Sequence, residues 1–414
     1  MKPTTVPYPC EETVTPDDQQ SLGAYVRDAY HAETAIYPVG GGTSLAYGLP
    51  ATRPGIALAT ERIDRVIDYP SRDMTLTVEA GIRIATLAQT VAAEGQCLPI
   101  DVPLPNRATL GGILATNTSG PRRYAMGTLR DYVIGIRAVD GRGIAFQAGG
   151  RVVKNVAGYD FCKLLIGSLG TIGVVTQVTL KLRPLPAASR LMLCQVDNPR
   201  QMESLLAAMV HSQTTPTAIE WIAGPHWLEG QAGLRTESET GCLVVGLEGT
   251  EVEIDWMIGQ LASEWEAQGM ANFVTLSEEQ TAPAWTALTE FPSLDGAPLV
   301  VKISVLPSCL PRMVGLVQQL DPTVSILAHA GNGILLIRFS QFDASDVTRR
   351  LIGQLQPAAM EAAGSVVVLS SQLPDLTRQA IWGHRDASVS VMETVRTAFD
   401  PRGILNPGRF IYQQ

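Results

Sequence analysis

Hydrophobic and polar positions change their spacing several times along residues 1–186, and each change marks a new element. Residues 16–33 begin with an acidic turn and carry Leu22, Val26 and Tyr30 at helical spacing, which predicts an amphipathic helix. Further helices are predicted at residues 83–95, 109–120 and 159–168. Short β-branched runs bounded by glycine or proline predict strands at residues 34–39, 55–60, 64–70, 74–81 and 173–186, and a hairpin at residues 130–150.

The pattern changes after Pro186, where glycines become rarer and the helical segments become longer. Strands are predicted at residues 190–197, 216–223, 241–249, 299–306, 324–331 and 333–340. Amphipathic helices are predicted at residues 199–212, 251–269, 309–321 and 344–361. This strand–helix–strand order indicates a ferredoxin-like layer of helices on an antiparallel sheet, although we find no sequence repeat of fixed period. The whole chain is therefore expected to be α+β.

Composition narrows the class of protein. The chain has 414 residues, of which 45% are hydrophobic and 17% charged, which is typical of a globular protein with two or three domains. A net charge of -9 argues against nucleic acid or anionic lipid as the main partner. We find neither a membrane-spanning stretch nor a secretory signal. Six scattered cysteines without a CxxC pair suit a reducing cytosol and offer no iron–sulfur or zinc framework.

Residues 40–42 are three consecutive glycines, and they lie between the predicted strand at 34–39 and the hydroxyl pair Thr43 and Ser44. Consecutive backbone N–H groups in such a turn form a concave site for an anion, and glycine lets a ligand approach the chain closely. The run matches neither the GxGxxG dinucleotide pattern nor the P-loop. From this run alone, a plain turn and a pyrophosphate-binding loop are equally good interpretations.

Two further glycine-rich runs follow, at residues 101–127 and 152–184. The first gathers small and hydroxyl-bearing residues, namely Thr109, Gly111, Gly112, Thr116, Asn117, Ser119 and Gly120. The second places GSLGTIG, residues 167–173, between a helix and a strand. Either run alone would also suit a close contact between packed elements. Because three such runs join strands to helices, we favour one extended ligand, flat at one end and anionic in the middle, as FAD is.

The chain reads, in order, PVGGGTS, TLGGILATNTSGPRR, VVKNVAGYDFCKLLIGSLGTIGVV and FDPRGILNPGR. This order resembles the FAD-binding proteins of the vanillyl-alcohol oxidase (PCMH-type) group, and among them the FAD-binding E subunits of bacterial glycolate oxidases. The resemblance implies a PCMH-type FAD-binding domain of two α+β subdomains at residues 1–186 and a ferredoxin-like cap at residues 187–375. Residues 376–414 would form a C-terminal helix and tail that pack back on the FAD domain.

The resemblance also implies which residues bind the cofactor. In the first run these are Pro38, Gly40, Gly41, Gly42, Thr43 and Ser44, which would wrap the FAD pyrophosphate. In the second they are Pro103, Thr109, Gly111, Gly112, Asn117 and Gly120, which would line the flavin and pyrophosphate. The third run would add Gly167, Gly170, Gly173 and Val174, and the C-terminal motif would return Asn406 and Arg409 to the flavin region.

Two features of the family can be compared with this sequence. Some relatives attach FAD covalently through His or Cys, but the glycine run has neither residue, so we expect non-covalent FAD. Related dehydrogenases of 2-hydroxy acids hold a divalent metal with an HxGDGNLH motif and a later Glu-His-Gly. This chain reads HAGNGILL at residues 329–336 and GSVVVLSS at 364–371, so we expect no metal site, and we interpret His329 as a polar residue at a sheet end.

The resemblance favours an FAD-binding subunit of a complex that oxidises a 2-hydroxy acid, glycolate, to a 2-oxo acid, glyoxylate. A sister flavoprotein subunit and an iron–sulfur subunit would be its partners, and the catalytic residues stay unassigned. The alternatives are a stand-alone FAD-dependent dehydrogenase and a structural subunit without flavin turnover. Lys154, Arg122 and Arg123 are candidates to pair with FAD phosphate or a substrate carboxylate, or are surface charges. We expect a cytoplasmic protein, with peripheral contact at the inner membrane face through partners as a further option.

Overall fold

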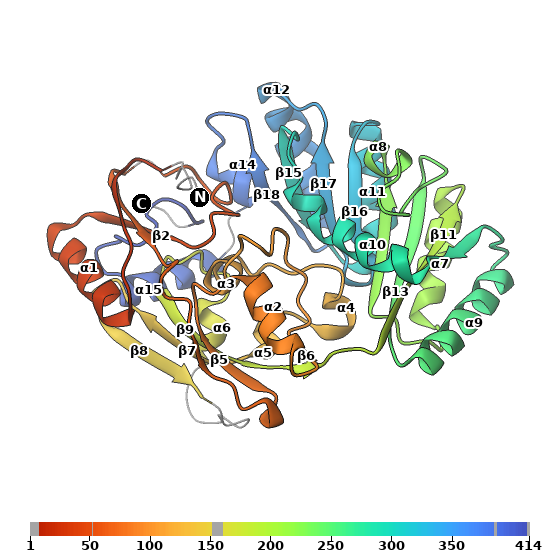
Figure 1. Ribbon diagram of the computed structural model, residues 1–414. Coiled ribbons are helices and arrows are strands. Elements are labelled where there is room, and N and C mark those ends of the chain that lie inside the picture. Colours follow the sequence, from red (N-terminus) through yellow and green to blue (C-terminus); the bar gives the residue numbers. More distant parts are fainter. Residues whose placement is uncertain (1–7, 52, 151–159, 385–386, 412–414) are drawn as a thin grey trace. The chain divides into compact units, whose positions relative to one another are not determined.

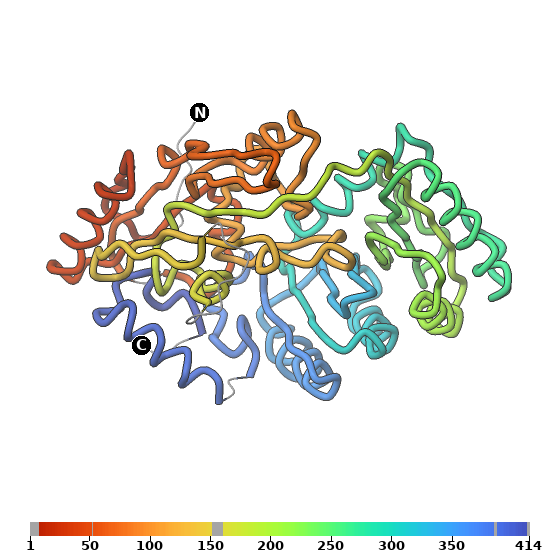
Figure 2. The backbone as a smooth tube through the Cα atoms, turned by 90° about the horizontal axis from the view of Figure 1, so that it is seen from below, coloured from red at the N-terminus to blue at the C-terminus, as the bar shows by residue number. Residues whose placement is uncertain are grey.

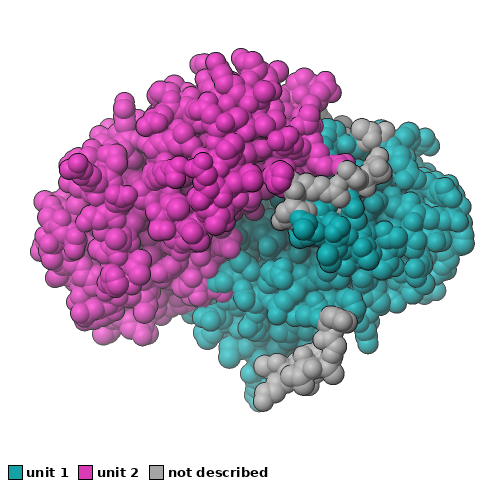
Figure 3. Space-filling view, turned by 180° about the vertical axis from the view of Figure 1, so that it is seen from behind, with its two compact units in different colours: residues 1–119, 127–185, 385–414 teal, residues 120–126, 186–384 magenta. Residues whose placement is uncertain are grey.

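The computed structural model describes residues 8–51, 53–150, 160–384 and 387–411. The chain divides into two compact units, shown in Figure 3. Unit 1 comprises residues 1–119, 127–185 and 385–414, and unit 2 comprises residues 120–126 and 186–384. Both units mix helices and sheets, as the sequence predicts for an α+β chain. The domain limits inferred from the sequence stay a prediction.

Unit 1 begins with a three-stranded parallel sheet. Its order is β1 (Cys10–Val14), β3 (Gly55–Ala59) and β2 (Ala35–Val39). Helix α1 (Gln19–Ala32) starts where Asp18 accepts a hydrogen bond from the Ser21 N–H at 2.7 Å, and it ends at Glu33 in the left-handed conformation. Its apolar stripe packs with residues of β2 and β3 in one buried cluster.

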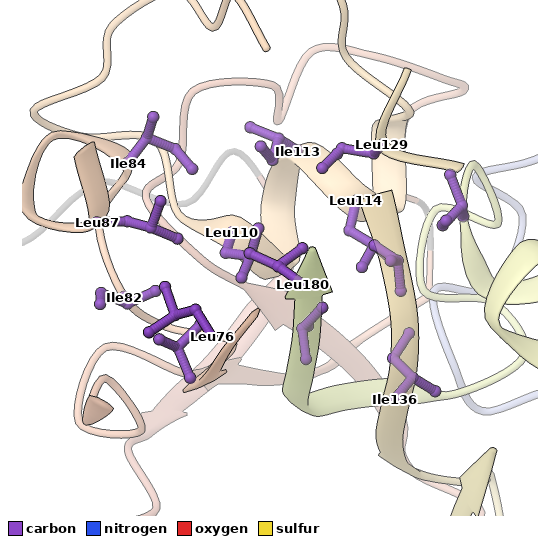
Figure 4. Close-up of a cluster of buried hydrophobic side chains, with 14 of the residues drawn as sticks. Leu76, Ile82, Ile84, Leu87, Leu110, Ile113, Leu114, Leu129, Ile136 and Leu180 are labelled. Atoms are coloured by element: carbon purple, nitrogen blue, oxygen red, sulfur yellow. The ribbon is translucent and has the colours of Figure 1, made fainter. Parts of the chain in front are cut away.

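A five-stranded antiparallel sheet forms the second part of unit 1. Its order is β4 (Val66–Asp68), β5 (Thr75–Glu79), β9 (Val174–Lys181), β7 (Val133–Val139) and β8 (Ala145–Gly149). The remaining short elements are β6 (Gln96–Cys97), β10 (Arg183–Pro184), α2 (Ile84–Ala92), α3 (Leu110–Thr116), α5 (Leu129–Tyr132), α6 (Phe161–Leu165) and the 3-10 turn η1 (Ser71–Asp73). Figure 4 shows the core between this sheet and helices α2 and α3.

The C-terminal segment returns to the first sheet of unit 1. After α15 (Ser388–Phe399), the chain runs beside β2, where Ile36 N–H donates to Ile404 O at 2.7 Å and Asn406 N–H donates to Ile36 O at 2.8 Å. Figure 2 shows the last residues in blue beside the first elements in red. Residues 404–406 therefore fold as part of the first sheet of unit 1.

Unit 2 is built on one eight-stranded sheet (Figure 1) whose neighbouring strands all run antiparallel. Its order is β14 (Phe273–Thr275), β11 (Ala188–Val196), β13 (Gly241–Gly249), β12 (Ala218–Ala223), β16 (Ser325–His329), β17 (Ile334–Phe339), β15 (Leu299–Ser304) and β18 (Ser365–Ser371). When the strands of each half are numbered in chain order, their order from the outer edge to the centre of the sheet is fourth, first, third, second. Two ferredoxin-like halves are thus joined through their second strands, β12 and β16.

The helices repeat the same pattern. In the first half, α7 (Pro199–Val210) and α9 (Glu251–Ala267) follow the first and third strands. In the second half these places are taken by α11 (Leu310–Leu320) and by a continuous helical stretch with a central π-helical turn, α12 (Ala344–Asp346), η5 (Val347–Leu355) and α13 (Gln356–Glu361). Outside the repeat lie α4 (Arg123–Met126), α8 (Pro225–Leu228), α10 (Glu278–Glu290), α14 (Arg378–Trp382), η2 (Phe291–Ser293), η3 (Pro307–Cys309) and η4 (Ala330–Asn332).

Arg122 anchors residues 120–126 to the sheet of unit 2. Its guanidinium donates to Glu248 Oε1 at 2.7 and 2.9 Å and lies 4.1 Å from the centre of the Trp285 ring. The Glu248 side chain is 5% exposed and the Arg122 side chain 23% exposed. Arg122, considered from the sequence as a partner of FAD phosphate or a substrate carboxylate, is therefore held by a carboxylate and a ring of its own unit.

We predict that Arg122→Met lowers the free energy of unfolding by about 3 kcal/mol, because it leaves the Glu248 carboxylate buried without this partner. The double variant Arg122→Met/Glu248→Met removes both charges and should recover most of that loss. Urea denaturation of the two variants and the unchanged chain measures the difference. Equal instability of the single and double variants would show that the ion pair is not the cause.

Candidate functional site

The glycine run leaves β2 and docks on the segment before α3. A side chain at Gly40 would overlap Oγ1 of Thr109, and a side chain at Gly41 would overlap the carbonyl oxygen of Arg107. The sequence suggested that a ligand approaches these glycines. In the structure, Gly40 and Gly41 lack side chains because another segment of the same chain is packed against them.

The backbone N–H groups of the glycine run are available as hydrogen-bond donors. Within the part of the chain that the structure describes, the backbone N–H groups of residues 40–45 donate no hydrogen bond. Gly42 has a φ of 68°, in the left-handed region that glycine adopts without strain. Successive N–H groups that have no acceptor in a turn of this kind form a site for an anion.

Helix α3 separates the core from the site. Leu110, Ile113 and Leu114 are buried in the hydrophobic cluster of unit 1, as Figure 4 shows. The other side of the helix therefore carries only small residues, of which Gly112, Ala115 and Thr116 line a cavity. Thr109 begins the helix by accepting the Gly112 N–H at 3.3 Å, and Asn117 ends it with a φ of 52°. The small residues of the motif thus give a narrow helix face beside the glycine run.

Two adjoining open cavities lie along this face, with empty volumes of about 560 and 490 Å³. Both are lined by residues of unit 1 alone. They share the residues Pro38, Gly40, Gly112, Ala115, Leu169 and Asn406. Two such cavities side by side suit an elongated ligand.

Most residues proposed from the sequence line one or both cavities. These are Pro38, Gly40, Gly41, Gly42, Thr43, Ser44, Gly111, Gly112, Gly170, Gly173, Val174, Asn406 and Arg409. Thr109, Asn117, Gly167, Pro103 and Gly120 do not line either cavity. Thr109 and Asn117 instead cap α3, and Gly120 belongs to unit 2. Lys154 lies outside the described residues.

Asn406 lies where the two cavities meet. Its side-chain N–H donates to Leu169 O at 2.6 Å, and its backbone has a φ of 43°. Its Oδ1 is buried and, among the described residues, has no hydrogen-bond partner. A buried amide oxygen without a donor is costly, so this atom suits an N–H or O–H group of a ligand.

Arg409 places a buried positive charge beside the glycine run. The residue is 5% exposed, and its guanidinium donates to the carbonyl oxygens of Leu45, Tyr47 and Leu49. Among the described residues, no carboxylate pairs with it, and burial lowers its pKa. A buried cation surrounded by neutral acceptors favours an anion in the adjoining cavity.

Two tyrosines complete this wall and were not proposed from the sequence. The Tyr8 ring lies 4.7 Å from the Arg409 guanidinium, and both Tyr8 and Tyr47 line the cavity that contains the glycine run. Burial raises the pKa of Tyr47 to about 12, so its hydroxyl stays protonated at neutral pH. Tyr47 follows Ser44 by three residues and was overlooked because the motif was considered to end at Ser44, whereas Tyr8 is brought to the site only by the folded chain.

Residues 329–336 of unit 2, the motif in which the sequence lacks the expected metal ligands, lie within the described residues. His329 ends β16, and its Nδ1 lies 2.7 Å from Glu220 Oε2 on β12, with both side chains almost fully buried. Among the described residues, no group of three or more His, Cys, Asp and Glu side chains is placed to hold a metal ion. His329 is thus a buried polar residue at the end of a strand with a carboxylate partner.

Comparisons with known proteins identify the family. The model of the FAD binding domain matches residues 11–149, and the model of the C-terminal domain of FAD linked oxidases matches residues 185–368 and 378–410. The second model covers more than half of the chain. The chain belongs to the FAD-linked oxidase family. FAD is therefore its cofactor, and its activity is that of an FAD-linked oxidoreductase.

Solved structures confirm the predicted PCMH-type fold. A structure of p-cresol methylhydroxylase with substrate bound superposes with a TM-score of 0.75 at 16% identity, covering 98% of this chain and 91% of that one. Alkyldihydroxyacetonephosphate synthase superposes with a TM-score of 0.69 at 17% identity, covering 95% and 76%. At these identities the likeness concerns the fold.

Curated relatives include enzymes of 2-hydroxy acids. D-2-hydroxyglutarate dehydrogenase of Xanthomonas citri pv. viticola is 26% identical over 95% of this chain and 88% of its own length. Glycolate oxidase subunit GlcD of Bacillus subtilis is 24% identical over 96% and 88%. Glycolate oxidase subunit GlcE of Escherichia coli is 34% identical over 42% of this chain and 49% of its own length.

The residues of unit 1 fit FAD. A dinucleotide carries a pyrophosphate between two ring systems, and here undonated N–H groups and a buried guanidinium lie beside two connected cavities. The buried Oδ1 of Asn406 adds an acceptor at the junction of the cavities. The polar and apolar parts of the site match the chemistry of this cofactor.

We predict that Gly41→Ala greatly reduces the amount of FAD that the purified protein retains. The added Cβ overlaps the Arg107 carbonyl and must push the glycine run away from the segment before α3. Flavin absorbance per mole of purified protein measures the loss. Gly259→Ala in α9 is the control, since a Cβ there has no atom within 4 Å and alanine favours a helix. Normal FAD content in Gly41→Ala would refute the packing requirement.

A second prediction concerns Arg409. Arg409→Met should weaken FAD binding by about 10- to 100-fold, the size of a charge-assisted contact, because the cavity loses its buried cation. Riboflavin has no phosphate, so its affinity should fall much less. Titration calorimetry of the apoprotein with both ligands measures the two effects. An equal loss for FAD and riboflavin would instead indicate collapse of residues 45–49.

Proposed function

We propose that this chain is the FAD-binding subunit of a glycolate oxidase-type complex that oxidises a 2-hydroxy acid, glycolate, to the 2-oxo acid glyoxylate. Two proteins named as glycolate oxidase subunits, GlcD and GlcE, are among its relatives. The whole-length similarity to D-2-hydroxyglutarate and D-lactate dehydrogenases supports the same substrate class. The E subunit is favoured because residues 329–336 and 364–371 lack the ligands of the family's metal motif.

The observation that carries the proposal is the cavity pair of unit 1. In it, the N–H groups of residues 40–44 and the charge of Arg409 bind the pyrophosphate. Asn406 and the small residues of α3 border the ring system. Thr109 and Asn117 act indirectly, by fixing where α3 begins and ends. Among the residues that the structure describes, no His or Cys lines either cavity, which supports a non-covalent cofactor.

Bound FAD supplies the hydride acceptor for oxidation of the substrate carbon. The chain's own share in unit 1 is to bind and orient that cofactor. The glycine run excludes side chains from the pyrophosphate site, and the half-buried Tyr8 and the buried Arg409 close one wall of it. The leucines of α3 keep the helix fixed on the core, so that its narrow face keeps its position.

Electron transfer onward requires a partner. The six cysteines do not form CxxC pairs, and three of them are buried in the described structure. We therefore propose an iron–sulfur subunit as the electron acceptor and a sister flavoprotein as the subunit that carries most substrate turnover. None of the helices in the described residues is long and apolar enough to cross a membrane. A cytoplasmic location, with membrane contact through the partners, is part of the same proposal.

A stand-alone FAD-dependent dehydrogenase is the second candidate. It is favoured by the relatives that match over almost the whole chain, since three of the first four with that coverage are named as dehydrogenases. A structural subunit without flavin turnover is a weaker third candidate, because the cavity pair and the buried cation that suit FAD are both present.

Anaerobic mixing of the purified flavoprotein with glycolate, D-lactate and D-2-hydroxyglutarate tests these candidates. For the subunit, we expect bound FAD and little or slow bleaching by the chain alone, and fast bleaching when the co-purified partners are present. Fast turnover by the isolated chain with an artificial acceptor would favour the stand-alone dehydrogenase. A colourless chain that takes up no added FAD would refute both.

A further inference from the structure

Helix α9 of unit 2 carries apolar or small residues on two opposite sides. The helix packs over β11 and β13 (Figure 1). The side that faces this sheet is formed by the buried residues Ile254, Met257, Leu261 and Trp265. The opposite side, which we call the outer stripe, consists of Val252, Trp256, Gly259 and Ser263. Both sets recur every three or four residues, as the sides of an α-helix do.

The outer stripe is open to solvent. Val252 is 80% exposed and Trp256 is 54% exposed, so two successive turns present large apolar side chains. A Cβ at Gly259 would meet no atom within 4 Å, and the Ser263 hydroxyl donates back to Gly259 O at 3.0 Å. Glycine inside a helix is unfavourable relative to alanine, and no packing within the described residues requires it at this position. The stripe therefore places an exposed tryptophan beside free space.

Carboxylates border the outer stripe on both sides. Helical spacing places Glu251, Asp255 and Glu266 along one side and Glu253 and Glu264 along the other. The helix itself contains no Lys, Arg or His. Glu253 and Glu264 accept hydrogen bonds from neutral groups, whereas the other three form no ion pair with any described residue. The negative charge along the stripe is thus not neutralised by the helix that carries it.

The corresponding helix in the second half of unit 2 differs in both respects. In the stretch α12, η5 and α13, Asp346 is paired with Arg349, and Glu361 is paired with Arg312 of α11. Met360 is the only large hydrophobic side chain that this stretch, all of it described, leaves mostly exposed. Because the two helices occupy equivalent places in the same fold, the acidic, apolar stripe of α9 is not a requirement of that fold.

We propose that the outer stripe of α9 is a docking surface for a partner protein that has an apolar pocket for Trp256 and a rim of Lys and Arg. Tryptophan buries a large area when it docks and is enriched among the residues that dominate interface energies. Carboxylates around it would attract a basic rim and repel other surfaces. The inference rests on the proposed function, in which the partner is a subunit of the same complex.

The charge of the stripe decides between possible occupants. In a two-fold dimer, a second copy of this chain would bring the same carboxylates to face one another, which is unfavourable. Anionic lipid would be repelled for the same reason. A protein with a positively charged face around an apolar pocket satisfies both the exposed tryptophan and the unpaired carboxylates.

Interferometry of the FAD-loaded full chain with the partner subunits that co-purify with it tests the surface. Trp256→Ser should raise the Kd at least about tenfold, as expected for a residue at the centre of an interface. Asp255→Lys/Glu266→Lys should also raise the Kd at low salt and make it less dependent on ionic strength. Met360→Ser and Glu361→Lys in α13 are the matched controls and should bind within about twofold of the unchanged chain.

Stability and oligomeric state are measured on the same variants. Since the altered side chains are exposed, the α9 variants should keep the Tm and FAD content of the unchanged chain. A lower Tm or lost FAD in Trp256→Ser would indicate a structural role and overturn the assignment. So would unchanged affinity in either α9 variant, an equal loss in the α13 controls, or the absence of any co-purifying protein. A dimer that becomes a monomer in Trp256→Ser would assign the surface to a second copy instead.

Flavin reduction distinguishes this inference from the proposed function. If Trp256→Ser loses the partner but no 2-hydroxy acid bleaches the flavin of the unchanged complex, the docking surface stands and the proposed function fails. If 2-hydroxy acids bleach the flavin quickly with the partners present and the α9 variants still bind them, the function stands and the surface fails. Fast bleaching that Trp256→Ser loses, and that a higher partner concentration restores, supports both.

Discussion

The close packing of Gly40 and Gly41 against residues 107–109 is the contact on which the cofactor site depends. It joins the end of β2 to the start of α3, so the two subdomains of unit 1 meet along bare backbone. With any side chain at these positions the segments would separate, and the two cavities would lose their common wall. The same contact holds the N–H groups of residues 40–44 in a turn that has no internal acceptor for them. The same contact therefore accounts for both the packing of the two segments and the turn that can bind an anion.

Arg409 makes this arrangement stable by joining distant parts of the chain. The C-terminal tail pairs with β2 through Ile36, and this places Arg409 where it reaches three carbonyl groups of residues 45–49. These contacts fix the segment that continues the glycine run. They also bury a charge for which the described residues supply no carboxylate. A site that binds an anion tightly must contain such an unneutralised group, at some expense to the stability of the empty protein.

The sequence predicted the fold class and proposed a set of site residues from its glycine-rich motifs, but it missed several individual elements. The glycine-rich runs were recognisable because each needs small residues at fixed places, and most of the proposed residues line the cavities. Strand β1 was missed because its three central residues, 11–13, are all polar and exposed, and α10 was missed because Pro283 interrupts its pattern. Tyr8 reaches the site only through long-range contacts, which no local pattern reports. The repeat in unit 2 was invisible because its halves share strand order and burial, not residues.

The difference between local sequence patterns and long-range contacts also applies to the polar face of the unit 2 sheet. The sequence shows that residues 329–336 lack the metal motif of related dehydrogenases, which alone suggests a face without function. Strand pairing shows more, because it brings Glu220, His329 and Lys302 from three strands to one side of the sheet. His329 is balanced by Glu220, whereas the Lys302 ammonium is not balanced within the described chain. The sequence therefore reports which residues of the motif are missing, whereas strand pairing determines which polar side chains this face carries.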